Sequence, residues 1–308
     1  MIIRFAARHF PGEQLKRIPV IINPISGQGI GLKVLPRIEA GLRELGYEPE
    51  IFQTQKGGDA RDIAAATPDD TPYIVTLGGD GTLNEVLNGV VPREITMAVF
   101  PTGTGNVFCK EIGLRRDVDF FLSLFKTGRV KRFDIGRADS RTFISVSGAG
   151  FNAEVVRRMD RANRGNMRMI EYIFPVIHAC LAYDFPPIRV EVDGELVVED
   201  AFLVEVGNTA SYGGPMEFTS LARPDDGLLD ICAIRKTARL TVLKHLFGTV
   251  TRMHLHYREV KYFKGKHVRL SSTKPVPTHV DGDENGMLPV DYTIMPMAAR
   301  VLVPAGNW

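Results

Sequence analysis

The chain has 308 residues, which is enough for two domains that each bury a full core. Its hydrophobic content of 44% and charged content of 24% are those of an ordinary soluble protein, and a formal charge of +2 is too small to indicate nucleic acid as a partner. The three cysteines are scattered without metal-ligand spacing, so we interpret them as small buried thiols in a reducing compartment.

The first third of the chain alternates between strand and helix patterns. Short apolar runs predict strands at residues 18–22, 50–54, 73–77 and 95–100, and helical spacing predicts helices at 35–45, 59–66 and 83–90. This alternation is typical of a parallel sheet with helices on its faces. Because ligands of such sheets bind beyond the carboxyl ends of the strands, we expect the three glycine-bearing loops that follow these strands to converge on one crevice.

After about residue 137 the pattern becomes mostly antiparallel β. Residues 188–192 and 195–198 flank an Asp193-Gly194 turn and predict a hairpin. Further strands are predicted at 202–206, 229–234, 260–263, 267–270 and 292–295, with helices near 167–183 and 239–256. We therefore predict two domains. The first is an α/β domain at residues 1–137, on which residues from about 297 to 308 can pack back, and the second is a β-rich domain at residues 138–296.

Neither a targeting segment nor a membrane span is predicted. Residues 1–12 lack the apolar core and the cleavage site of a signal peptide. The most apolar stretch, residues 167–183, is interrupted by Arg168, Glu171 and His178. We therefore expect a soluble cytoplasmic protein.

The most informative motif is GGDGTLNE at residues 78–85. Three glycines in four positions allow a sharp turn and leave no Cβ to keep a ligand away. Thr82 and Glu85 stand at capping-box spacing, so we predict a helix that begins at Thr82 and offers free N–H groups to a phosphate. Asp80 adds a carboxylate among these donors, which indicates a metal–phosphate site rather than a purely anion-binding turn.

Two companion loops follow other strands of the same predicted sheet. They are NPISGQG at residues 23–29 and PTGTGN at residues 101–106, and both offer small residues, hydroxyls and an amide. A single glycine-rich turn of this kind is as often structural as functional. Three of them at one sheet edge favour phosphate binding.

These motifs, in this order, resemble those of the diacylglycerol kinase catalytic-domain family, which includes bacterial lipid kinases and the related sphingosine and ceramide kinases. The resemblance continues through VGN at residues 206–208, LARPDDGLLD at 221–230 and VDGD at 280–283. It implies an ATP-dependent lipid kinase that transfers the γ-phosphoryl group to the hydroxyl of diacylglycerol or a similar lipid. It also implies a parallel-sheet nucleotide domain similar to that of NAD kinases, a C-terminal antiparallel β-sandwich domain, and an active site in the cleft between them.

The resemblance also implies a set of site residues. A Mg²⁺ ion would be bound by the Arg223 carbonyl, the Asp226 carboxylate and the Leu228 carbonyl. ATP would be bound by Asn23, Pro24, Ser26, Gly27, Thr54, Gly78, Gly79, Asp80, Gly81, Thr82, Asn84, Glu85 and Thr104.

Three aspartates are the predicted catalytic residues. Asp283 matches the family's general base and Asp281 can share that role, while Asp80 organises metal and phosphate. Two positions depart from the family pattern: Asp283 replaces a glutamate, and Val107 follows Asn106 where bacterial members have an aspartate. An exposed turn is the alternative interpretation of residues 281–286, and a turn aspartate that bonds its own backbone is the alternative for Asp80.

The lipid partner is marked less clearly. We expect lipid substrate at the inner face of the membrane, with peripheral association, and a homodimer is a possible assembly. The helix at 239–256 has an apolar stripe that fits either a membrane interface or an ordinary packed helix. A group of basic side chains fits a membrane-facing patch, a patch that binds a substrate phosphate, or a solvated helix face; its members are Arg157, Arg158, Arg161, Arg164 and Arg168. We interpret three further histidines as surface residues, namely His245, His254 and His256.

Two other functions stay open at this level. NAD kinases share the GGDGT run, so a kinase with a soluble substrate is one alternative. A catalytically silent protein that binds nucleotide or lipid is the other, because of Val107 and Asp283. The residues also leave the lipid open among diacylglycerol, a sphingoid base, a polyprenol and phosphatidylglycerol.

Overall fold

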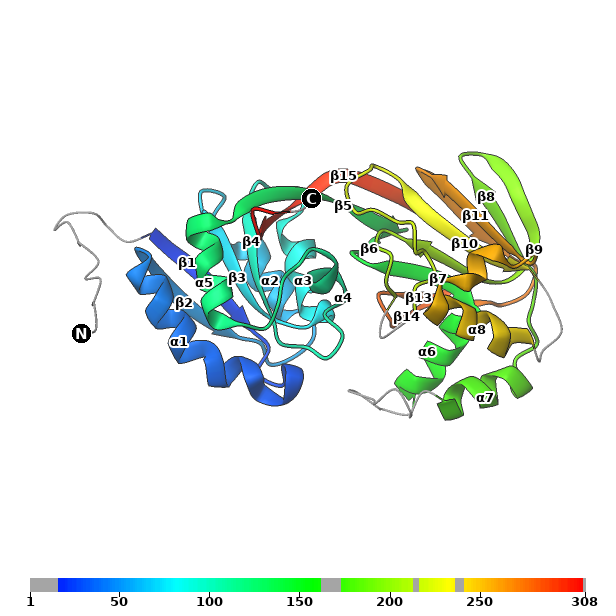
Figure 1. Cartoon of the computed structure of the whole chain (residues 1–308), viewed down its shortest axis with the longest axis horizontal. Coiled ribbons are helices and arrows are strands. Elements are labelled where there is room, and N and C mark those ends of the chain that lie inside the picture. Colours follow the sequence, from blue (N-terminus) through cyan, green and yellow to red (C-terminus); the bar gives the residue numbers. More distant parts are fainter. Residues whose placement is uncertain (1–15, 162–172, 213–215, 236–240, 307–308) are drawn as a thin grey trace. The chain divides into compact units, whose positions relative to one another are not determined.

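The structure, a computed structural model, describes residues 16–161, 173–212, 216–235 and 241–306 (Figure 1). These residues form two compact units, and the chain passes from one to the other twice. Residues up to 131 and from 300 onward form unit 1, and residues 132–299 form unit 2. Within the described ranges, no helix combines the length and the apolar character that crossing a bilayer requires.

Unit 1 is built on a parallel sheet with the strand order β2-β1-β3-β4-β15. Nearly every residue of β3 and β4 is buried, as expected for strands that helices cover on both faces. The predicted parallel α/β architecture is therefore confirmed. The strands are β1 (Lys16–Ile22), β2 (Tyr47–Gln53), β3 (Tyr73–Gly78), β4 (Thr96–Pro101) and the end of β15 (Val290–Val303).

Helices connect these strands on both faces of the sheet. The helix α1 packs with α5, and α2 packs with α3 (Figure 1). The predicted helix at residues 59–66 is confirmed as α2, while α1 begins earlier than its apolar stripe indicated. The helical segments are η1 (Ser26–Gly29), α1 (Ile30–Glu44), α2 (Asp59–Ala66), α3 (Asp80–Val90), α4 (Val107–Glu111) and α5 (Val118–Thr127).

Unit 2 is mostly antiparallel β, as predicted, and contains the hairpin expected at Asp193-Gly194. Both turn residues have positive φ, as a tight hairpin turn with the twist of its strands requires. The two strands expected at residues 195–198 and 202–206 are one long strand, β9. The first strands are β5 (Arg129–Ala138), which begins in unit 1 and continues into unit 2, β6 (Arg141–Phe143), β7 (Val146–Gly150), β8 (Ile188–Val192) and β9 (Glu195–Gly207).

The later strands of unit 2 complete a sheet in which β7, β9, β8, β12 and β15 are neighbours, and β10 pairs with β9 and β11. They are β10 (Leu229–Arg235), β11 (Val260–Gly265), β12 (His267–Ser271), β13 (Pro277–Val280), β14 (Asp283–Met287) and the first part of β15. Helical segments lie between them at α6 (Phe151–Arg161), α7 (Ile173–Ala182), α8 (Thr241–Thr251) and η3 (Met253–His256).

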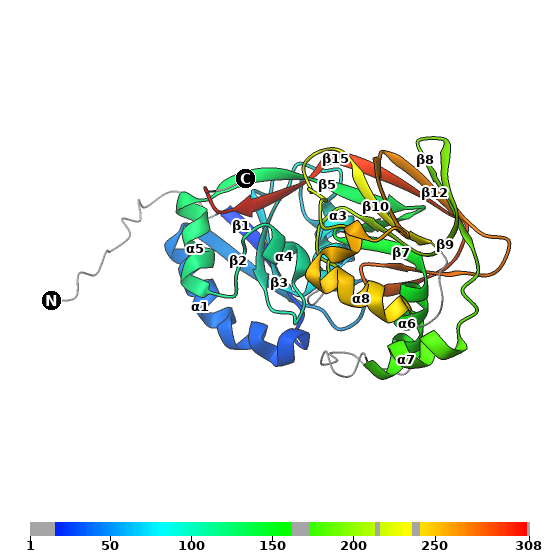
Figure 2. The same cartoon turned by 45° about the vertical axis from the view of Figure 1, so that its right-hand side comes forward.

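Two apolar clusters fill unit 2, and β9 contributes to both. Val204 and Val206 belong to a cluster formed by strands, whereas Leu203 belongs to a cluster formed with the helices. The division is regular on β10, where Ile231 and Ala233 belong to the first cluster and Cys232 belongs to the second, because successive side chains of a strand point to opposite faces. The second cluster lies where α6, α7 and α8 cover β9, β10 and β11 (Figures 1 and 2).

Candidate functional site

The carboxyl edge of the unit 1 sheet brings three loops together. Parallel register aligns Ile22 with Leu77, so β1 and β3 end side by side, and β4 ends next to them. The Asn23 amide donates to Thr82 Oγ1 at 3.2 Å, which joins the loop after β1 to the start of α3. The Thr102 hydroxyl donates to Ser26 Oγ at 3.0 Å, which joins the loop after β4 to the loop after β1. The predicted convergence of the three loops is confirmed.

Glycines let the backbones of these loops touch. A Cβ on Gly103 would lie 2.6 Å from the Cα of Gly79, and a Cβ on Gly27 would lie 1.8 Å from the Thr102 carbonyl oxygen. Gly27 also has a positive φ of 57°, which disfavours any side chain. Gly81 is different, because a Cβ there would meet nothing within 4 Å. Loop packing therefore explains Gly27, Gly79 and Gly103, and leaves the backbone at Gly81 open to a ligand.

The predicted capping box at Thr82 and Glu85 is wrong. The helix α3 begins at Asp80 after Gly79, and no side chain caps it. The Glu85 carboxylate instead accepts a hydrogen bond from the Ala60 N–H at 3.1 Å, at the start of α2. The reason is tertiary packing, since α2 lies against α3 and a carboxylate is stabilised at a helix N-terminus. The N-terminus of α3 is thus left without a side-chain cap.

Asp80, the first residue of α3, belongs to the second motif and lies beside the third loop. A Cβ on Gly105 would be 2.9 Å from Asp80 Oδ2, so the third loop passes directly beside this carboxylate. After burial, the negative charge of Asp80 is the second cause that raises the pKa of the Cys109 thiol. The placement brings an acidic oxygen to the loop cluster, as the sequence predicted.

Arg116 is a residue of this region that the motifs did not indicate. Its guanidinium donates to the carbonyls of Pro101 (3.1 Å) and Thr102 (2.8 Å), and also to that of Gly103. It therefore fixes the path of the third loop from outside the motif. No sequence pattern indicates that a single arginine beyond the glycine loop fixes the path of that loop.

The remaining predicted ATP residues lie around the same edge in unit 1. Thr54 follows β2, and its N–H donates to the Ile22 carbonyl at 3.0 Å. Asn84 lies along α3, where its side-chain oxygen accepts from Asn88 at 2.7 Å. Pro24 is half-buried and Thr104 is exposed. Val107, where the family has an aspartate, is buried at the start of α4.

An open surface hollow also lies on unit 1, at the opposite edge of the sheet. It borders the start of β1 at Lys16 and Arg17 and the residues that precede β3 at Thr71 and Pro72. It contains none of the predicted site residues, and parallel sheets bind ligands at the other edge.

Asp281 and Asp283 differ sharply in their surroundings. The Asp281 carboxylate accepts three backbone hydrogen bonds, from Ile144 (2.9 Å), Ser145 (2.9 Å) and Val146 (3.1 Å). It therefore ties the start of β7 to the end of β13. The Asp283 side chain is 71% exposed, with an oxygen 3.9 Å from Arg141. Of the two predicted bases, Asp283 is the one whose carboxylate faces solvent.

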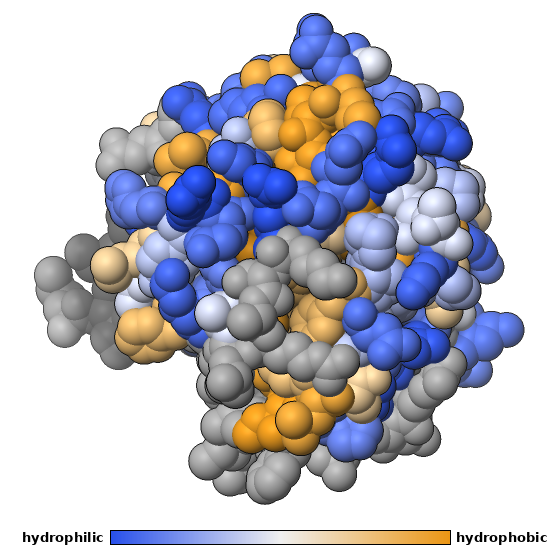
Figure 3. All heavy atoms as spheres, turned by 90° about the vertical axis from the view of Figure 1, so that its right-hand side faces the viewer, coloured by the Kyte–Doolittle hydropathy of each residue, from blue (hydrophilic) through white to orange (hydrophobic). Residues whose placement is uncertain are grey.

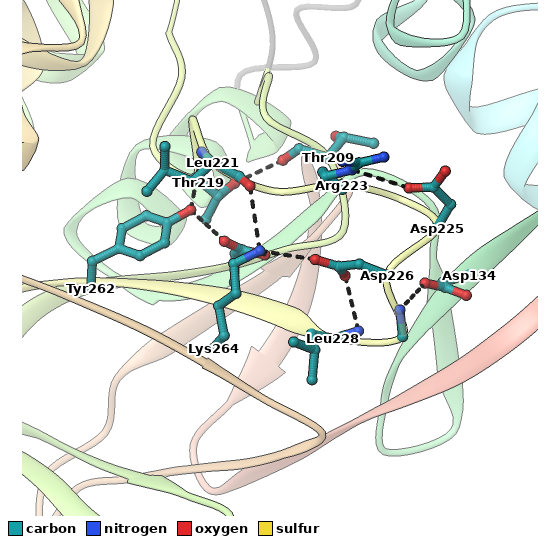
Figure 4. A network of polar contacts seen from close by, with 12 residues as sticks. Asp134, Thr209, Thr219, Leu221, Arg223, Asp225, Asp226, Leu228, Tyr262 and Lys264 are labelled. Atoms are coloured by element: carbon teal, nitrogen blue, oxygen red, sulfur yellow. Dashed lines mark hydrogen bonds and ion pairs between the residues drawn. The ribbon is translucent and has the colours of Figure 1, made fainter. Parts of the chain in front are cut away.

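The loop predicted to bind Mg²⁺ is held by side chains from other strands (Figure 4). Asp226 Oδ1 accepts from the Leu228 N–H at 3.1 Å, and its Oδ2 lies 2.9 Å from the Lys264 ammonium. Arg223 pairs with Asp225 at 3.4 Å. Within the described ranges, no group of three or more histidine, cysteine, aspartate or glutamate side chains is arranged to hold a metal ion.

Asp134 and Lys264 support this loop and were not predicted. The Asp134 carboxylate accepts from the Gly227 N–H at 2.6 Å and from the Met297 N–H at 2.8 Å, and burial raises its pKa. Partial burial acts to lower the pKa of Lys264, but the hydrogen bonds and charges of Asp226 and Asp230 outweigh it and raise that pKa. Both residues lie far along the chain from the motif, so no local pattern indicates them.

Two of the three histidines are not on the surface, so that prediction is wrong for them. His254 is fully buried, and its ring nitrogens lie 3.2 Å from the Gly248 carbonyl and 3.0 Å from the Phe218 carbonyl. His245 is also buried, which lowers its pKa. His245 lies on α8, which covers the second apolar cluster, whereas His254 lies on η3, which packs against α8. His256 is exposed, as predicted.

The predicted basic patch is only partly described. Arg157 and Arg158 both bond the buried Glu154, at 2.8 and 2.6 Å, so they are tied to α6. Arg164 and Arg168, the Arg161 side chain, the first part of the helix predicted at 167–183, and residues 239 and 240 of the other helix lie outside the described residues. Apolar side chains are exposed on α7 and α8, and the space-filling view shows apolar patches separated by hydrophilic side chains (Figure 3).

Comparison with known proteins matches two successive parts of the chain to two family models. Residues 17–138 match the diacylglycerol kinase catalytic domain, and residues 145–303 match the YegS C-terminal NAD kinase beta sandwich-like domain. A diacylglycerol kinase of Staphylococcus carnosus is 30% identical over 299 residues, covering 94% of this chain and 95% of that protein. A diacylglycerol kinase of Staphylococcus aureus strain Newman is 29% identical over 296 residues, covering 94% and 93%.

Solved structures show the same fold. A crystal structure from Bacillus anthracis str. Sterne superposes with a TM-score of 0.79 at 24% identity, covering 96% of this chain and 99% of that chain. A diacylglycerol kinase structure from the same organism gives a TM-score of 0.71 at 22% identity, covering 95% and 98%. The two family models and the relatives, which cover 94% of the chain, indicate the same protein family. The chain therefore belongs to the diacylglycerol kinase family of lipid kinases, whose catalytic domain uses ATP.

Proposed function

We propose that this chain transfers the γ-phosphoryl group of ATP to the hydroxyl group of diacylglycerol or a closely similar lipid. The observation that carries the proposal is the cluster of three strand-end loops, in which Asn23 bonds Thr82, Ser26 bonds Thr102, and the backbone of Gly81 is open. A glycine backbone at an uncapped helix N-terminus suits the phosphates of a nucleotide. Phosphoryl transfer depends mainly on such positioning and on compensation of charge.

Asp80 supplies the acidic oxygen of the loop cluster. Mg²⁺ prefers oxygen ligands and is usually bound through one or two carboxylates together with substrate phosphates. Asp80 fits this role because its carboxylate lies beside Gly105, where the phosphates would be bound. We infer that Asp80 binds the ion that accompanies ATP, where the ion would offset the charge of the transferred group.

Asp283 is the proposed general base. A base must reach the proton of the acceptor hydroxyl, so its carboxylate must be open to substrate. Asp283 is 71% exposed, whereas the oxygens of Asp281 accept three backbone N–H groups. We therefore assign proton acceptance to Asp283, and to Asp281 the positioning of the turn that carries it.

We infer that the protein binds its lipid substrate at a membrane surface and that unit 2 contacts this surface. Leu181 on α7 is 71% exposed and Phe247 on α8 is 66% exposed, which is unusual for large apolar side chains. Replacing Phe247 by serine should reduce co-sedimentation with phosphatidylglycerol vesicles. Val130→Ser is the matched control, because Val130 is an exposed apolar residue of unit 1. Equal sedimentation of the two variants would argue against this surface.

The decisive experiment measures transfer of γ-labelled phosphate over a panel of acceptors. The panel contains diacylglycerol, a sphingoid base, a polyprenol, phosphatidylglycerol and NAD, and products are identified by mass. We expect the label to extract into organic solvent with diacylglycerol. Label that stays in the aqueous phase with NAD, or no turnover with any acceptor, would refute the proposal.

A further inference from the structure

The loop at residues 221–228 of unit 2, called here the acidic loop, contacts a lysine from a neighbouring strand, Lys264. Lys264 lies on β11 and is paired in register with Asp230 on β10. Its Nζ is 2.9 Å from Asp226 Oδ2, 3.3 Å from Asp230 Oδ2 and 3.5 Å from the Leu221 carbonyl oxygen (Figure 4). All of these neighbours are oxygens of the kind that a hard metal ion would bind.

The two carboxylates need a cation between them. Asp230 is fully buried, and its other oxygen accepts from the Tyr262 hydroxyl at 2.7 Å. The Asp226 side chain is only 24% exposed. Two carboxylates that are largely removed from water are stable only when a positive charge compensates them. Lys264, with 34% of its side chain exposed, supplies that charge from the neighbouring strand.

A metal ion does not fit this arrangement as it stands. Among the three ligands implied for Mg²⁺, Asp226 provides the only carboxylate, and both of its oxygens are engaged, one with Leu228 N–H and one with Lys264. Mg²⁺ binds oxygens at about 2.0–2.1 Å and repels an ammonium group held on the same carboxylate. Binding of the ion at Asp226 would therefore require Lys264 to leave, which would remove the positive charge that compensates Asp230.

We propose that Lys264 takes the place of the metal ion in this loop. Its ammonium is a covalently attached cation that joins Asp226 to Asp230 and fixes residues 221–228 without Mg²⁺. The inference rests on the contacts of unit 2 alone, so it holds whichever acceptor the enzyme phosphorylates. Lys264 is thus a positioning residue, and metal dependence belongs to the ATP complex and not to this loop.

The test counts bound ions in the absence of nucleotide, with Mn²⁺ as the spectroscopic probe for Mg²⁺. Electron paramagnetic resonance is recorded on the wild-type protein and on Asp226→Asn. Equal numbers of bound Mn²⁺ in the two proteins are the expected result. A wild-type protein that binds an ion which Asp226→Asn lacks would overturn the proposal, and this comparison does not depend on any lysine variant folding.

Removing the ammonium should create the metal site. In Lys264→Ala the melting temperature should fall and should be restored by Mg²⁺, and about one additional Mn²⁺ ion should be bound per chain, as for a single hard-cation site. Lys264→Arg keeps the charge and should need no metal. Lys261→Ala is the matched control, because Lys261 is an exposed lysine on the same strand. A Lys264→Ala protein that melts like the wild type in metal-free buffer would also refute the proposal.

Discussion

The loop cluster of unit 1 and the acidic loop of unit 2 are held in place by different means. In unit 1, glycines allow backbone to pack on backbone, as where Gly79 meets Gly103. In unit 2, the loop at residues 221–228 is held by charged side chains of other strands, namely Asp134 and Lys264. A site formed by backbone packing can therefore be recognised from its own sequence motif, whereas a site held by charged residues that are distant in the sequence cannot.

The largest effect is expected at Asp80, whose carboxylate lies beside the third glycine loop. Asp80→Asn should lower phosphoryl transfer by at least about 1,000-fold, because the charge that organises metal and phosphate is removed. The circular dichroism spectrum should not change. Asp70→Asn is the control, since Asp70 is an exposed aspartate of the same unit. Retained activity of Asp80→Asn would mean that this edge works through its backbone alone.

The next largest effects should distinguish the role of Asp283 in turnover from the role of Asp281 in stability. Asp283→Asn should lower turnover by about 100-fold, as for loss of a general base, with little change in the melting temperature. Asp281→Asn should instead cost about 1.5–3 kcal/mol of stability, because three backbone N–H groups lose a charged acceptor. Denaturant unfolding and turnover of both variants measure this. Equal stability losses would contradict the separation of the roles.

A pair of glycine substitutions tests directly how the backbone forms the loop cluster of unit 1. Gly27→Ala should lose about 1–3 kcal/mol of unfolding free energy, because its Cβ would strike the Thr102 carbonyl and its φ is positive. Gly81→Ala should keep full stability, since its Cβ meets nothing, yet should raise the KM for ATP about tenfold by obstructing phosphate. Urea titration and steady-state kinetics provide the two readouts. If the KM of Gly81→Ala equalled that of the wild type, phosphates would not lie there.

The smallest effect is expected for an exposed ion pair of unit 2 away from the site. Asp200→Asn should cost only about 0.2–1 kcal/mol, because its partner Arg235 and Asp200 itself are both well solvated. The hydrogen bond from Arg235 lowers the pKa of Asp200, so the contribution is present at neutral pH and is lost as the pH falls below roughly 4. Thermal melts at both pH values measure it. A larger loss would show that charged pairs matter throughout unit 2, beyond the acidic loop.

Sequence patterns predicted unit 1 well because its determinants are local. The strands β3 and β4 are buried, largely apolar runs, and parallel pairing forces their loops to one edge. The meeting of Asn23 with Thr82 followed from these strand assignments. The start of α3 was missed because Glu85 is used by a neighbouring helix, which no local motif records.

Unit 2 was predicted less completely because its key contacts join distant residues. The hairpin at Asp193 was evident from its turn chemistry. The burial of His254 and the pairing of Lys264 with Asp226 depend on which strands and helices become neighbours. A polar residue in the sequence is read as exposed unless its partner can be identified, and here the partners lie tens of residues away.

The path of β15 bears on how the protein is made. Its first residues pair with β12 in unit 2, and its last ones, Arg300 and Val301, complete the unit 1 sheet beside β4. During synthesis, the nucleotide-binding sheet therefore remains one strand short until all of unit 2 has been translated. A ribosome-bound chain stalled before residue 300 would hold β4 as an open edge, which invites pairing with other chains. The completion of the unit 1 sheet is thereby coupled to the translation of unit 2.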